Sequence, residues 1–164
     1  MASVDSVNAD FSQDQKLREL AQAFGRASAT QDVQAFRQIA TPDVTLSVPG
    51  TSRLAGRHEG PDDVLHVPGA LQRAGLKLEV LFVATGASSV IICGRDHGEG
   101  NGVSLDVTMA LLLTVTGDRI SGVSAHISDV AAFTAFVDAA VLPRDRANDP
   151  SCLWPVPPRP AAGA

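Results

Sequence analysis

The sequence predicts an α+β fold in which a cone-shaped, curved antiparallel sheet packs against helices and encloses an apolar pocket. Two observations support this prediction. Apolar residues recur at helical spacing near the beginning and the end of the chain, whereas the long stretch between them alternates apolar and polar residues as strands do. With 164 residues, the chain is also long enough to bury a core as one domain.

The strongest strand signal is residues 103–116, followed by a Gly117-Asp118 turn and a returning strand over 119–128. Within 103–116 every odd position is apolar and most even positions are polar. Because side chains alternate across a strand, the odd positions are expected to line a buried face. Strands over 76–84 and 89–97 are expected to complete a meander with this pair.

Two helices are predicted before the first strand. The first begins at Ser12, which can cap it with Gln15 as its capping-box partner, and continues to about Ala29. The second begins at Asp32 and is stopped by Pro42.

A strand over 43–48 and an irregular loop over 51–60 are expected to follow. The third helix starts with Pro61 at its first position and ends or kinks early at Pro68. Asp129 caps the last helix.

The chain is therefore divided into three segments. Residues 1–11 are expected to form a flexible N-terminus, residues 12–142 the cone domain, and residues 143–164 a Pro-rich tail without regular structure.

Composition excludes several classes of function. A net charge of −5 without a basic stripe argues against nucleic-acid binding, which needs clustered cations. No stretch approaches the ~20 apolar residues of a membrane span, and the first ten residues have no secretory signal pattern. Cys93 and Cys152 share no metal or redox spacing, so a reducing, cytoplasmic location is expected.

Between residues 17 and 142 the chain carries, in order, Asp32-Val33, Asp43-Val44, Val48-Pro49-Gly50, Leu54-Ala55-Gly56, Gly60-Pro61-Asp62-Asp63-Val64, Gly117-Asp118-Arg119-Ile120 and Asp129. In order and spacing these motifs resemble the SnoaL-like polyketide cyclase family. That family belongs to the nuclear transport factor 2-like (NTF2-like) superfamily, with ketosteroid isomerase and limonene epoxide hydrolase as relatives. The resemblance implies the cone fold, no cofactor, and a homodimer formed through the outer sheet face near Ala110 and Leu112.

The catalytic positions of these relatives hold other residues here. By the resemblance, Phe24 stands at the oxyanion-hole tyrosine of ketosteroid isomerases, Val48 near their general base, and Leu111 near their protonated acid. Ala125 stands near the carboxylate that the cyclases and epoxide hydrolases carry on the last strand. The resemblance is therefore specific for the fold rather than for the chemistry, because one fold hosts many functions.

Three residues are candidates for acid–base catalysis. A histidine can accept and donate a proton in acid–base catalysis, which makes His126 a candidate, but strand alternation turns it away from the pocket unless a bulge intervenes. Asp96 is either a pocket acid or, beside His97 at a Gly-rich hairpin, a solvated residue. Asp106 has the polar parity of its strand, so it is either catalytic or a solvated or subunit-facing carboxylate.

The leading hypothesis is a cofactor-independent cyclase or isomerase of secondary metabolism that folds a bulky, polyketide-like substrate in an apolar pocket. Arg57 could hold an anionic group of the ligand, and no metal site is expected. The alternatives are a non-catalytic protein that binds a hydrophobic small molecule, and an epoxide hydrolase, which needs a base and an acid flanking the ring. The predicted pocket lining is Phe24, Leu46, Val48, Val67, Val107, Met109, Leu111 and Ala125.

Overall fold

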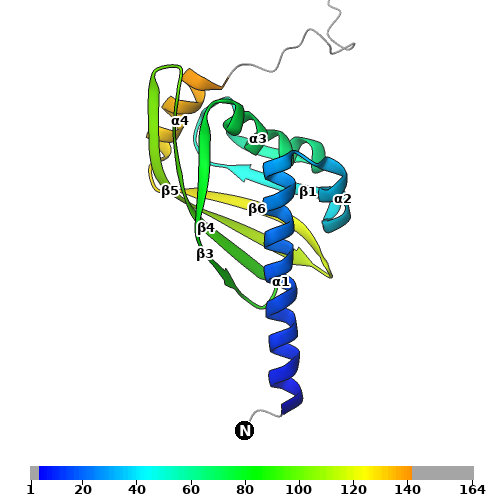
Figure 1. Cartoon of the computed structure of the whole chain (residues 1–164). Coiled ribbons are helices and arrows are strands. Elements are labelled where there is room, and N and C mark those ends of the chain that lie inside the picture. Colours follow the sequence, from blue (N-terminus) through cyan, green and yellow to red (C-terminus); the bar gives the residue numbers. More distant parts are fainter. Residues whose placement is uncertain (1–3, 142–164) are drawn as a thin grey trace, which may run out of the picture.

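The computed structural model describes residues 4–141, which form four helices and one six-stranded sheet (Figure 1). The helices are α1 (Val4–Thr30), α2 (Val33–Ile39), α3 (Pro61–Arg73) and α4 (Val130–Ala140). The strands are β1 (Ala40–Val48), β2 (Gly56–Glu59), β3 (Leu76–Thr85), β4 (Ser89–Gly100), β5 (Val103–Thr116) and β6 (Arg119–Ile127). The predicted α+β class is confirmed, and the segment 143–164 lies outside the described residues.

The sheet has the strand order β2-β1-β6-β5-β4-β3. Strands β3 to β6 form the predicted antiparallel meander. In addition, β1 pairs with β6 in parallel, so the predicted antiparallel sheet is mixed at this one pairing and otherwise antiparallel. The chain between β1 and β6 includes α3 and most of the meander, and a crossover of this length permits parallel pairing.

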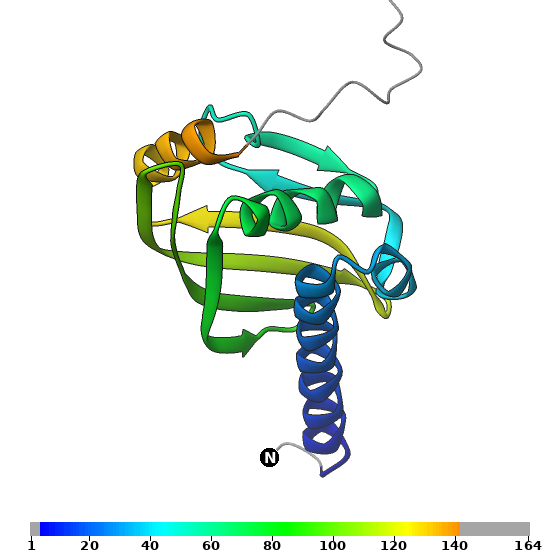
Figure 2. The same cartoon turned by 45° about the horizontal axis from the view of Figure 1, so that its top comes forward.

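The helices cover one face of the sheet. Figure 2 shows α1 and α3 lying across the same side, which we call the inner face; the opposite side is the outer face. The alternation predicted for β5 places its odd positions on the inner face, and five of them are buried: Leu105, Val107, Met109, Leu113 and Val115. The core therefore lies between the inner face and the helices.

Helix α1 begins at Val4, so the predicted start at Ser12 is wrong. No Gly or Pro lies between these two residues, and nothing in the sequence interrupts the helix there. The first turns of α1 project beyond the sheet (Figure 1). Phe11, near this end of the helix, is 73% exposed. None of the helices within residues 4–141 is both long and apolar enough to cross a membrane.

Prolines interrupt the chain less than the sequence predicts. Helix α3 runs through Pro68 to Arg73, because a buried face that includes Val64 and Val67 packs on the core and offsets one lost helical hydrogen bond. Pro42 lies inside β1, at the irregularity in the pairing of β1 with β6, where a strand tolerates a missing N–H donor. The expected loop over 51–60 contains the edge strand β2.

Asp32 and Asp129 cap helices as predicted. The Asp32 carboxylate accepts a hydrogen bond from the backbone N–H of Ala35 at 2.9 Å. Asp129 accepts one from the N–H of Ala132, also at 2.9 Å. These bonds satisfy N–H groups that the first turns of α2 and α4 leave without helical partners.

Candidate functional site

Asp96 is the charged side chain that the fold buries. It lies on β4, where it pairs with Leu78 of β3 and Val107 of β5. Its side chain is on the inner face of the sheet, and the residue is only 3% exposed. No other charged side chain is buried among the residues the structure describes. Of the two alternatives for Asp96, the solvated residue at a hairpin is wrong, because β4 continues to Gly100 and places Asp96 well inside the strand.

The carboxyl group of Asp96 has no hydrogen bond or ion pair with any described residue. Burial disfavours the charged form of an acid, and it raises the pKa of Asp96 to about 7. Both protonation states are therefore populated near neutral pH. A group of this kind can accept a proton and return it without a cofactor.

Asp96 adjoins apolar surface that is open to solvent. Leu78 and Val80 share its face of the sheet, yet they are 46% and 55% exposed. Leu78 leans over Gly94, where a Cβ atom would collide with the Leu78 side chain. We call Leu78 and Val80 the inner-edge pair, because they occupy the inner face of the edge strand β3. The buried acid is thus flanked by an exposed apolar surface.

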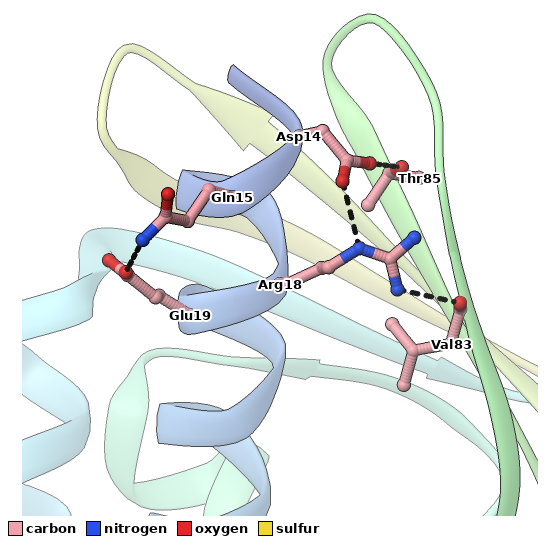
Figure 3. A network of polar contacts seen from close by, with 6 residues as sticks. All are labelled: Asp14, Gln15, Arg18, Glu19, Val83 and Thr85. Carbon is pink, nitrogen blue, oxygen red and sulfur yellow. Dashed lines mark hydrogen bonds and ion pairs between the residues drawn. The ribbon is translucent and has the colours of Figure 1, made fainter. Parts of the chain in front are cut away.

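A polar network fixes where α1 crosses β3 (Figure 3). Arg18 Nε binds Asp14 Oδ2 at 2.9 Å, Arg18 Nη1 donates to the carbonyl oxygen of Val83 at 3.2 Å, and the Thr85 hydroxyl donates to Asp14. The Thr85 hydrogen bond, followed by that of Arg18, lowers the pKa of Asp14. The network holds α1 at the far end of β3, away from the inner-edge pair. Only the Asp14–Arg18 spacing signals it in the sequence.

Most of the predicted pocket lining belongs to the core. Leu111 and Ala125 are half-buried. The other six predicted apolar residues are between 4% and 9% exposed: Phe24, Leu46, Val48, Val67, Val107 and Met109. Phe24 packs against Phe36 with ring centroids 5.7 Å apart. Of this set, Val107 is the direct strand partner of Asp96.

An open groove of about 530 Å³ lies elsewhere, between α1 and the β5–β6 turn. Its walls include Leu17, Leu20, Val115 and Asp118. Neither Asp96 nor any residue of the predicted lining contributes to this groove. The groove therefore does not correspond to the pocket expected from the sequence.

His126 lies on the outer face. It is exposed, and it pairs with Ala110 in a stretch of regular β5–β6 register. The irregularity between these strands falls at Thr114 and Val115, so no bulge turns His126 inward. The structure therefore does not bring His126 and Asp96 together.

Asp106 also lies on the outer face, where it forms an ion pair with Arg95. Arg95 Nε and Nη2 reach the two carboxylate oxygens of Asp106 at 2.7 and 2.5 Å. This hydrogen bonding lowers the pKa of Asp106 and raises that of Arg95. His97 stands opposite Asp106, with its Nε2 4.0 Å from Glu79 Oε2. Asp106 is thus held as a carboxylate in a surface charge network.

Arg57 is on the edge strand β2, not in a loop as expected. It is exposed, and its Nε lies 3.7 Å from Glu59 Oε2. Strands β2 and β3 are opposite edges of the sheet, so Arg57 and the inner-edge pair lie on different edges. In the described part of the chain, no group of three or more His, Cys, Asp or Glu residues could hold a metal ion.

These features define an NTF2-like fold in which Asp96 is the one acid buried on the inner face among the described residues. An NTF2-like protein from Burkholderia xenovorans LB400 superimposes with a TM-score of 0.65 at 16% identity, covering 77% of this chain and 97% of that protein. A protein from Jannaschia sp. CCS1, named a putative SnoaL-like polyketide cyclase, gives 0.61 at 14% identity over 80% and 96%. The predicted resemblance is confirmed for the fold.

Sequence comparison then gives the family. The chain is 34% identical over 119 residues to the uncharacterized protein Rv0034 of Mycobacterium tuberculosis. The aligned region covers 70% of this chain and 87% of the relative. The chain belongs to the family of this mycobacterial protein. No protein-family model matches the sequence.

Proposed function

We propose that the protein is a cofactor-independent cyclase or isomerase in which Asp96 transfers a proton on a bulky hydrophobic, polyketide-like molecule. The observation that carries the proposal is the Asp96 carboxyl group, which is buried, has no partner among the described residues, and has its pKa raised to about 7. Groups with strongly shifted pKa values concentrate at functional sites. The fold shared with a cyclase-named neighbour agrees with this assignment.

In the proposed reaction, ionised Asp96 removes a proton from a carbon next to a carbonyl group, and the protonated acid returns it to another carbon or to oxygen. The inner-edge pair supplies an apolar surface for the substrate skeleton, since Leu78 and Val80 are exposed beside Asp96. With one acid available, the remaining acceleration comes from holding the substrate folded, and well-oriented intramolecular reactions gain on the order of 7–11 kcal/mol.

The proposal includes a homodimer formed through the outer face. Phe82 and Ile91 expose 56% and 37% of their surfaces, and Leu112 and Ala110, on the same face, are half-buried. A second copy of the chain would remove this apolar patch from water. The ligand is expected to be a small molecule rather than nucleic acid, given the net charge of −5, and the expected location is the cytoplasm.

The second candidate is a non-catalytic protein that binds a hydrophobic molecule. By the resemblance, Phe24 stands at, and Val48 and Leu111 stand near, positions that hold catalytic groups in ketosteroid isomerases, which favours this reading. Opening of an epoxide by water ranks last, because it needs two groups flanking the ring and Asp96 is the one buried carboxylate among the described residues.

The test uses 2-tetralone, an apolar bicyclic ketone, with exchange of its α-protons in D2O followed by NMR. Wild-type protein is expected to accelerate exchange, and Asp96→Asn to reduce the catalysed rate by roughly 10²–10⁴-fold, the usual contribution of general acid–base catalysis. The catalysed rate is expected to rise with pH around 7, as Asp96 ionises. Asp106→Asn, which changes an outer-face carboxylate, is the matched control.

The outcomes separate the candidates. Equal exchange by wild type and Asp96→Asn would contradict a catalytic role for Asp96. Binding of 2-tetralone without accelerated exchange would favour the non-catalytic protein. Failure of a panel of bicyclic and tricyclic ketones to bind would contradict both.

A further inference from the structure

We propose that the segment 142–164 docks on the inner-edge pair of its own chain, with Leu153 and Trp154 packing against Leu78 and Val80. Because the inner-edge pair is also the surface proposed for the substrate, the docked segment and a bound ligand would exclude one another. This docking does not rest on a catalytic role for Asp96, because its argument uses only exposure, distance and sequence.

The docking surface is an uncovered part of the inner face. Leu78 and Val80 point to the side that the helices cover, but they remain 46% and 55% exposed. Helix α1 reaches β3 further along, where Arg18 binds the Val83 carbonyl oxygen. Helix α3 ends at Arg73, three residues before β3 starts at Leu76, so the end of α3 lies beside the first residues of the strand. The middle of β3 therefore lies between the places where α3 and α1 meet the strand, and it presents apolar side chains to water.

The segment departs from a point close to this surface. The side-chain amide of Asn101 donates to the Ala139 carbonyl oxygen at 2.8 Å, which ties the end of α4 to the β4–β5 turn. A Cβ atom placed on Gly100 would collide with the Ala74 carbonyl oxygen and approach Ala140 Cβ at 2.9 Å. The end of α4 thus lies beside Ala74, two residues before the start of β3.

The distance is well within reach. From Leu76 to Val80 the strand advances by about 13 Å, at roughly 3.3 Å per residue. The chain from Val141 to Leu153 can span up to about 40 Å when extended. The apolar residues of the segment can therefore reach the inner-edge pair with slack to spare.

The sequence of the segment suits side-chain packing rather than strand addition. It holds six of the ten prolines of the chain, at positions 143, 150, 155, 157, 158 and 160. Proline lacks the N–H that a sheet ladder needs, so continuous pairing with the free edge of β3 is disfavoured. Leu153, Trp154 and Val156 form its apolar cluster, and a Trp indole buries a large area against an apolar surface.

The test exploits the composition of the chain. Trp154 is its only Trp and Tyr is absent, so fluorescence excited at the indole band reports on this segment alone. In the full-length protein we expect a blue-shifted emission maximum and acrylamide quenching several-fold weaker than in the chain unfolded by guanidinium. Val80→Asp is expected to restore both values toward those of the unfolded chain, because it places a charge on the docking surface.

Phe82→Asp is the matched control. Phe82 is 56% exposed on the same strand but belongs to the outer face, so this variant is expected to leave Trp154 protected. Circular dichroism checks that each variant is folded, and Leu78→Ser replaces Val80→Asp if that variant is not. Measurements over a range of protein concentrations separate docking on the same chain from docking on a second copy.

Three results would overturn the proposal. The first is quenching of Trp154 in the folded protein equal to that in the unfolded chain. The second is exposure of Trp154 by Phe82→Asp with none by Val80→Asp or Leu78→Ser, which would place the segment on the outer face. The third is loss of protection on dilution, which would assign the contact to a second copy. Because the readout is fluorescence, none of these results bears on proton transfer by Asp96.

Discussion

Asp96 and Asp106 lie on neighbouring strands, one register step apart, but on opposite faces of the sheet. The inner acid is buried without a partner, and burial raises its pKa to about 7. Asp106 on the outer face is exposed and accepts hydrogen bonds from Arg95, which lower its pKa. Because a slip of one residue exchanges the two faces of a strand, the register decides which carboxylate can exchange protons near neutral pH.

The largest expected effect contrasts the two faces in the same strand. Leu113 is fully buried on the inner face, so Leu113→Ala is expected to reduce the free energy of unfolding by about 2–5 kcal/mol. Leu112 is half-buried on the outer face, and Leu112→Ala is expected to cost under about 1 kcal/mol. Urea unfolding of both variants at one protein concentration measures the difference. Equal losses would contradict the assignment of the faces.

The next effect is a pH-dependent gain in stability for Asp96→Asn. The folded pKa of about 7 exceeds the ordinary value of 3.8, so between these pH values the folded chain retains a proton that the unfolded chain has lost. Wild-type stability should therefore fall as pH rises through this window. At 1.36 kcal/mol per pKa unit, the cost above pH 7 is up to roughly 4 kcal/mol.

Chemical denaturation at pH 4 and pH 8 tests this linkage. The advantage of Asp96→Asn over wild type is expected to grow between the two pH values. A pH-independent difference between the two proteins would mean that Asp96 ionises normally in the folded chain.

A smaller effect concerns Asp129, whose carboxylate serves structure. Asp129→Ala removes the hydrogen bond to the N–H of Ala132 and is expected to cost about 1 kcal/mol. Asp129→Asn keeps an acceptor and should recover most of the loss in a thermal unfolding experiment. Loss of proton-exchange activity in a folded Asp129→Asn protein would give this residue a role beyond capping.

The smallest effect is expected on the outer face. Asp106→Asn removes the ion pair with Arg95. Both side chains are solvated, and salt screens the attraction between them, so the pair contributes little stability. Because the pKa of Asp106 is lower in the folded chain than its ordinary value, ionised Asp106 stabilises the fold at pH values above that ordinary pKa. This stabilisation is lost as the pH falls through the pKa of the folded chain. We therefore expect a slight fall in melting temperature at neutral pH and low salt, which vanishes at high salt. A large, salt-independent fall would contradict a solvated pair.

Much of the fold follows from local patterns. The parity of residues 103–116 predicts which face of β5 is buried, and Asp32 and Asp129 mark helix starts that the structure confirms. Strand β2 and the passage of α3 through Pro68 were not predictable, because long-range packing overrides local preference there.

The sequence left open whether Asp96 is a buried pocket acid or a solvated residue, for a similar reason. The Gly-rich run after it predicts a loop, but these glycines extend β4 because other backbone passes very close. A Cβ atom on Gly98 would collide with the carbonyl oxygen of Gly75, and one on Gly100 with that of Ala74. The outward direction of His126 was predictable from alternation alone.

The exposure of the inner-edge pair could not be predicted at all. It depends on where α1 crosses the sheet, and the Thr85–Asp14 contact that fixes this crossing joins residues distant in sequence.

The most direct measurement is a 13C NMR titration of the aspartate side-chain carboxyl carbons, with Asp96→Asn and Asp106→Asn used to assign the two signals. The account predicts a midpoint of about 7 for Asp96 and one below 3.8 for Asp106 in the same sample. A midpoint near 3.8 for Asp96 would show that the inner acid is solvated, and the proposed proton transfer would fall with it.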